Sequence, residues 1–171
     1  MRGIERYKKK RLKERSSHET LQDHLGALVS LGTLQLQFEE WEAAERSFEV
    51  AVSVSKTSAD ALYGLGVSLA RQKKFDLSVR AFASCVMHEP SHAEAYIEWG
   101  EVLRTNLQFG GAITCFKHAL NKRNRLPVDL RISVLMQLGE LYKQTGDPSA
   151  ASNCFEEVMR VRPDLDAGRK V

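Results

Sequence analysis

The sequence predicts an all-α fold, an array of four stacked helix pairs, because one pattern of residues returns four times. A glycine recurs after a bulky apolar residue, a small residue stands twelve positions after each glycine, and a phenylalanine stands sixteen positions after it. The glycines are Gly32, Gly66, Gly100 and Gly139, the small residues are Ala44, Ser78, Ala112 and Ala151, and the phenylalanines are Phe48, Phe82, Phe116 and Phe155. Self-similarity at a period of 20 to 50 residues is typical of stacked repeat proteins.

Each repeat is expected to contain two helices. Counting from seven residues before each glycine places the repeats at residues 25–58, 59–92, 93–126 and 132–165. Apolar residues at helical spacing predict a first helix through the glycine and a second helix through the phenylalanine. In the fourth repeat, Asp147 is expected to cap the second helix and Pro148 to open it. No repeat can bury its apolar face alone, so neighbouring repeats must stack.

The glycine inside each first helix requires an explanation, because glycine costs a helix about 1 kcal/mol relative to alanine. We expect the compensating gain to be a close approach of the second helix, with the small residue as the facing surface. The phenylalanine is expected to fill the space between one repeat and the next.

This pattern resembles the tetratricopeptide repeat. The second repeat carries it most fully, with Leu65-Gly66, Phe82, Cys85 and Pro90 at the positions where the family places its characteristic residues. The resemblance implies a right-handed α-solenoid of about four helix-turn-helix repeats, a non-catalytic scaffold without cofactors that binds a protein or peptide in its concave groove. The first and third repeats lack the final proline, and five extra residues lie between the third and fourth repeats, within Asn121–Arg131.

The resemblance divides the chain into three parts. Residues 1–16 form a basic N-terminal tail that is expected to be flexible, residues 17–165 form the array, and residues 166–171 form a C-terminal tail. A capping sequence at Ser16–Glu19 places the start of the first helix near Ser17. The six residues after Leu165 are too few for a closing helix. The last helix is therefore polar enough itself, or its edge self-associates, or the chain is a fragment.

The resemblance also implies which residues face the groove. They are Val29, Thr33, Tyr63, Val67, Arg71, Glu94, Ile97, Glu98, Glu101, Arg104, Met136 and Glu140. An apolar row runs along the first helices, and three glutamates of the third repeat share one helical face. This surface suits a partner with apolar and basic side chains. The alternative is that the apolar row is only the groove floor usual in the family, and that the charged residues form a solvated face in which Arg71 pairs locally.

Binding of chaperone tails is not expected. Similar co-chaperones grip a C-terminal carboxylate with lysine, asparagine and arginine side chains. The corresponding positions here hold Val29, Thr33, Gly64, Glu94 and Glu98, of which none matches and two carry the wrong charge.

The net charge of +3 hides an asymmetry, because residues 1–15 hold eight basic and two acidic residues. The basic residues of the tail include Lys8, Lys9, Lys10, Arg11, Lys13 and Arg15. The tail has four interpretations: a solubilising end, a nuclear import signal, a contact for RNA or an acidic membrane, or a ligand for the acidic groove. A second basic cluster comprises Lys117, Lys122, Arg123, Arg125 and Arg131. Together they support an alternative function, association with nucleic acid.

The sequence contains no recognisable motif for other classes of function. His88 and His92 have the spacing of metal ligands, but Pro90 breaks the helix between them, so we expect no metal site. No phosphate loop or activated nucleophile is recognisable, and we expect no enzymatic activity. The apolar runs are too short to span a bilayer. Without an N-terminal hydrophobic segment the expected location is cytoplasmic, with a nuclear location as the alternative suggested by the basic tail.

Overall fold

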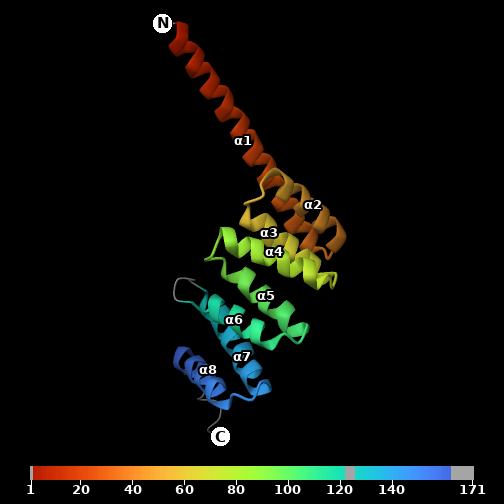
Figure 1. Cartoon of the computed structure of the whole chain (residues 1–171), viewed down its shortest axis with the longest axis vertical. Coiled ribbons are helices and arrows are strands. Elements are labelled where there is room, and N and C mark those ends of the chain that lie inside the picture. The colour runs from red at the N-terminus through yellow and green to blue at the C-terminus, as the bar shows by residue number, and fades with distance from the viewer. Residues whose placement is uncertain (1, 122–125, 163–171) are drawn as a thin grey trace.

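A computed structural model describes residues 2–121 and 126–162, with side chains from Glu19 onward, and all regular structure in these residues is helical. The helices are α1 (Arg2–Gln37), α2 (Trp41–Val54), α3 (Ala59–Arg71), α4 (Phe75–His88), α5 (Ala93–Thr105), α6 (Phe109–Ala119), α7 (Val128–Gln144) and α8 (Pro148–Val161). Figure 1 shows four helix pairs stacked into an elongated array, with α1 at one end and α8 at the other. The predicted all-α solenoid is confirmed.

The N-terminal segment differs from the prediction. The helix α1 begins at Arg2 rather than near Ser17, so from Arg2 onward the expected separate tail is continuous with the first helix of the array. The segment is rich in Lys, Arg and Glu, which favour helix, and no proline interrupts it. In Figure 1 this part of α1 projects beyond the helices that pack on its C-terminal half.

A phenylalanine ring lies directly on the glycine of its own repeat. A Cβ atom added to Gly66 would meet the Phe82 ring at 2.6 Å, and the equivalent distance in the other repeats is 2.7 or 2.8 Å. Carbon atoms in contact normally lie about 3.5–4.0 Å apart. The rings of Phe48, Phe82 and Phe116 are at most 1% exposed. The glycine therefore makes room for an aromatic ring, rather than mainly for the small residue of the second helix.

The expected roles of the phenylalanine and the small residue are both partly visible. The Phe48 ring also occupies the space over Gly64 of the next repeat, so it joins two repeats as well as two helices. The small residue Ser78 is fully buried, and its hydroxyl donates a 2.8 Å hydrogen bond to the carbonyl of Gly66. Two apolar clusters, centred on Phe82 and Phe116, share the partly buried Trp99 and so form one continuous core.

Each first helix ends in the same turn. The residue in the turn has a left-handed backbone in all four repeats, with φ of 60° at Glu39, 61° at Lys73, 59° at Leu107 and 80° at Gly146. In the third repeat the amide of Leu107 donates to the Arg104 carbonyl at 3.0 Å and the next amide donates to Leu103 at 2.8 Å. The equivalent pair of bonds recurs in the other repeats, and it is the pair that defines a Schellman motif. The fourth turn continues as predicted, because Asp147 accepts from the Ala150 amide at 2.9 Å and Pro148 opens α8.

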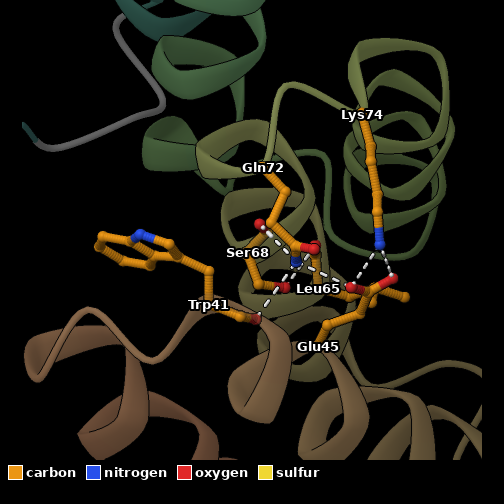
Figure 2. Close-up of polar contacts among 6 residues, drawn as sticks. All are labelled: Trp41, Glu45, Leu65, Ser68, Gln72 and Lys74. Atoms are coloured by element: carbon orange, nitrogen blue, oxygen red, sulfur yellow. Dashed lines mark hydrogen bonds and ion pairs between the residues drawn. The ribbon is translucent and has the colours of Figure 1, made fainter.

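Polar contacts join the first repeat to the second. The Gln72 amide group donates to the Glu45 carboxylate at 2.7 Å and to the Trp41 carbonyl at 3.3 Å. Lys74 donates to the same carboxylate at 2.7 Å (Figure 2). Burial opposes ionisation of Glu45, but the hydrogen bonds from Lys74 and Gln72 outweigh it and lower the pKa of this carboxyl group. Glu45, which α2 presents to the next repeat, is therefore held as a carboxylate.

We predict that Gly66→Ala destabilises the protein by about 1–3 kcal/mol, because the Phe82 ring beneath the new methyl group is fully buried and cannot withdraw. The matched control is Gly26→Ala in α1, where no atom lies within 4 Å of the added carbon. That change is expected to stabilise the helix by up to about 1 kcal/mol. Urea unfolding measures both, and equal effects of the two substitutions would contradict the packing argument.

We predict that Leu107→Gly raises the free energy of unfolding by about 1 kcal/mol, because it relieves a left-handed backbone at a non-glycine residue. Little burial is lost, since Leu107 is 75% exposed. The reverse change at the equivalent position, Gly146→Ala, is expected to destabilise by a similar amount. Thermal and urea unfolding of both variants test this, and a less stable Leu107→Gly protein would contradict it.

Candidate functional site

The first helices α1, α3, α5 and α7 line one side of the stack. The helix α3 contacts both α1 and α5, whereas no contact of comparable extent joins successive second helices in the described residues. In a curved stack the more closely spaced row of helices lies on the inner side. We call this side the inner row.

An open hollow of about 430 Å³ lies between α3 and α5, and we call it the first hollow. Three residues expected to face the groove, Arg71, Glu98 and Glu101, line it together with Lys73 and Thr105. Its wall therefore carries both signs of charge, with basic residues from the second repeat facing acidic residues from the third.

A second hollow of about 380 Å³ lies between α5 and α7. Arg104, Met136 and Glu140, also expected to face the groove, line it with Gln137 and Gln144. The Met136 side chain is 43% exposed and supplies apolar surface. The two hollows follow one another along the inner row, because α5 contributes a wall to each.

The acidic residues of the inner row have basic neighbours. Arg71 lies 3.8 Å from Glu98 across the first hollow, and Arg104 bonds Glu101 at 2.6 Å on the same helix. The Lys143 ammonium group lies 3.0 Å from Glu140, which lines the second hollow. The local pairing that the sequence left as the alternative is therefore present, and the row is less one-sided in charge than its glutamates alone indicate.

Each hollow is lined by one residue that has a buried oxygen atom without a hydrogen-bond partner. The Oε1 atom of Glu101 in the first hollow and the Oε1 atom of Gln137 in the second are shielded from solvent and accept no hydrogen bond. A buried polar atom that lacks a partner costs about 1–3 kcal/mol. Because these atoms are closed to solvent, an N–H donor would remove this cost only if the Glu101 or Gln137 side chain turned its Oε1 atom toward the hollow.

Glu98 and Tyr63 lie at a partly dehydrated part of the inner row. Burial, together with the charge of Glu101, raises the pKa of Glu98, although Arg71 works in the opposite direction. Burial and the charges of Glu98 and Glu94 raise the pKa of Tyr63 to about 12. The Tyr63 ring packs 4.8 Å from the ring of His92, which caps α5, so this tyrosine lies against the start of α5.

The other residues expected in the groove differ in how deeply they are buried. Val67 is 8% exposed and belongs to the core around Phe82. Ile97 packs against the core around Phe116. Val29 is half-buried, and Thr33 is exposed with its hydroxyl bonded to the Val29 carbonyl. Glu94 is exposed beside His92.

Gln137 was not among the residues expected in the groove. It occupies the position in the fourth repeat that Glu98 occupies in the third, 39 residues earlier, so the repeat alignment contained the signal. The basic residues expected in the tail, Lys8 to Arg15, lie in the α1 segment whose side chains the structure does not describe. In the second basic cluster, residues 122, 123 and 125 lie outside the described residues, and Arg131 pairs with Glu157 on α8.

The part of the chain that the structure describes offers no other kind of site. It contains no cluster of three metal-ligating side chains, and none of its helices is long and apolar enough to cross a membrane. The three cysteines are buried, and burial raises the pKa of Cys85 and Cys115 to about 12. These thiols are therefore unreactive core residues at neutral pH.

Two family models, each described as a tetratricopeptide repeat, match the chain, one over residues 29–85 and the other over residues 91–164. The chain belongs to the tetratricopeptide repeat family. Tetratricopeptide repeats are typically non-catalytic modules that bind other proteins, and the helix pairs and the inner row described above fit that role. No curated protein sequence matches this tetratricopeptide repeat protein.

Solved structures share the fold. PilF of Pseudomonas aeruginosa superposes with a TM-score of 0.73 at 22% identity, covering 84% of this chain; the chain spans 64% of PilF. MamA of Desulfovibrio magneticus gives 0.69 at 20% identity, covering 91% and 90% of the two chains. The Yersinia enterocolitica secretion chaperone SycD, in complex with a peptide of the translocator YopD, gives 0.68 at 18% identity, covering 72% and 95%. These comparisons lend no support to the nucleic-acid alternative.

We predict that Glu98→Gln and Glu45→Gln have opposite effects on stability at neutral pH. The pKa of Glu98 is raised, so its contribution to stability is full below the ordinary value of 4.5 and falls as pH rises through the folded pKa. Its neutral replacement therefore stabilises at pH 7. The pKa of Glu45 is lowered, so its contribution exists above 4.5 and is lost as pH falls through the folded pKa.

Urea unfolding at neutral pH and below pH 4.5 tests this pair. Glu45→Gln is expected to destabilise at neutral pH, and both differences from the wild type are expected to shrink in acid. A Glu98→Gln protein that is less stable than the wild type at neutral pH would show that the Arg71 pairing outweighs burial.

Proposed function

We propose that this tetratricopeptide repeat protein is a non-catalytic scaffold that binds an extended segment of a partner protein along its inner row. The observation that carries this proposal is the pair of successive hollows, each lined by a residue whose Oε1 atom has no hydrogen-bond partner. A peptide lying across α3, α5 and α7 would place N–H donors, from its backbone or from basic side chains, beside Glu101 and Gln137, whose side chains would turn to accept them. Binding by an extended chain uses such donors for affinity and the flanking surface for specificity.

The lining of the hollows indicates the partner's side chains. Met136 offers an apolar contact in the second hollow, and the stem of Arg104 borders the same space. The glutamates are paired, so a basic side chain of the partner would have to compete with Arg71, Arg104 or Lys143. We therefore expect apolar residues and backbone donors to contribute more than basic residues. The similarly folded SycD forms a complex with a peptide, which supports peptide binding by this fold as an analogy.

The test uses two methionines on different sides of the array. Peptides that bind the unmodified chain are selected from a displayed library. Their affinities are then measured for the variant Met136→Arg, in the second hollow, and for the variant Met87→Arg, on the second helix α4. Both side chains are exposed, so neither change disturbs the core.

We expect Met136→Arg to weaken binding about tenfold or more, and Met87→Arg to change it by less than about twofold. Replacement of Gln137 by alanine is expected to weaken binding as well, since it removes the acceptor. Peptides whose affinity depends on Met87 and not on Met136 or Gln137 would contradict the proposal.

A further inference from the structure

The helix α1 presents an apolar stripe that no described segment covers. Ala27, Leu31, Leu34 and Phe38 follow one another at spacings of four, three and four residues, which places them on one face of the helix. Leu31, Leu34 and Phe38 are 46%, 49% and 70% exposed. Leu31 is the bulky residue before Gly32, so the sequence predicts a packed position for it. In the structure it is instead exposed at the end of the array.

The later repeats show what normally covers this stripe. The equivalent residues of the second repeat are Ala61, Leu65, Ser68 and Gln72, and Ala61 and Ser68 are fully buried. The second helix of the preceding repeat lies against them, because α2 packs on α3 and Gln72 bonds both Glu45 and the Trp41 carbonyl (Figure 2). The same arrangement joins α4 to α5 and α6 to α7. Among the described residues, no second helix covers the α1 stripe.

At the opposite end of the array, no described first helix covers the outer side of α8. The residues Ser152, Phe155 and Met159 of α8 correspond to Glu45, Phe48 and Val52 of α2, which face the following repeat. Phe155 is only partly buried, whereas Phe48, Phe82 and Phe116 are at most 1% exposed. The difference arises because no described helix packs on the outer side of α8.

We propose that copies of this chain associate head to tail, with α8 of one copy seated on the α1 stripe of the next. The occupant is a second copy because one chain carries both halves of the same joint, at its two ends, and the joint itself occurs three times inside the array. The array would then continue from one molecule into the next. Such an interface is heterologous, so it forms open chains of copies unless the rotation closes a ring.

The end residues are compatible in this arrangement. Phe38 stands where Gln72 stands in the internal joint, and it would meet Pro148, which stands in the place of Trp41. Glu40 occupies the place of Lys74 and would face Ser152, which occupies the place of Glu45, so no like charges oppose one another. An apolar contact thus replaces the polar one shown for Gln72.

Sedimentation equilibrium of the full chain tests the proposal with two blocked variants. Leu34→Glu/Phe38→Glu blocks the α1 stripe, and Ser152→Glu/Met159→Glu blocks the α8 face and sets a carboxylate against Glu40. The control Leu77→Glu/Met87→Glu removes two comparably exposed apolar residues of α4. Circular dichroism checks that each variant is folded, and the single change Phe38→Glu, at a side chain 70% exposed, replaces the first variant if it is not.

As the protein concentration is raised to about 100 µM, we expect the average mass of the wild type and of the control to rise above the mass of two chains. Each blocked variant alone is expected to remain at 19.3 kDa. Mixed in equal amounts, the two blocked variants are expected to form a dimer of twice that mass, because each retains one intact half of the joint.

Any one of four results would overturn the proposal. The first is a wild type that stays monomeric over this range. The second is a variant blocked at α8 that still assembles as the wild type does, which would indicate symmetric pairing of α1 helices. The third is a mixture of blocked variants that remains monomeric. A control that fails to assemble would place the contact on the second helices and would also reject the head-to-tail arrangement.

Discussion

The structure depends on the contact between a phenylalanine ring and a helical glycine. This contact lets the two helices of a repeat approach closely, and in the first repeat the same ring reaches Gly64 of the second. One side chain therefore stabilises the hairpin and orients its neighbour. Since each repeat contacts chiefly the repeats beside it, the geometry of this contact sets the spacing of the first helices and so the dimensions of the inner row.

The period of the glycines and phenylalanines was sufficient to predict the helix pairs, because burial of an aromatic ring over a glycine is a local requirement with a fixed spacing along the chain. The start of α1 was not predictable in the same way. Capping residues at Ser16 and Ser17 favour a helix end there, but a helix continues through them when the flanking residues also favour helix. The left-handed turns at Glu39, Lys73 and Leu107 were also hidden, because only the fourth repeat has the glycine that usually indicates them.

The candidate site was predictable in outline. The repeat alignment identifies the residues that project from the first helices, and six of the expected residues line the two hollows. The charge pattern was not, because a row of glutamates in the sequence does not show that Arg104 and Lys143 fold back onto Glu101 and Glu140 one turn away. Nor does the sequence alone distinguish Val67, which turns into the core, from its neighbours. These outcomes depend on helix rotation and side-chain direction, which the repeat pattern does not specify.

The methionine methyl groups report directly on whether the inner row is the binding surface. Of the described methionines, Met136 lines the second hollow, Met87 lies exposed on α4 and Met159 lies on α8. In NMR spectra of protein labelled at these methyl groups, a bound peptide is predicted to shift the Met136 signal and to leave the Met87 signal in place. A peptide that binds and shifts Met87 while Met136 stays unchanged would contradict the account.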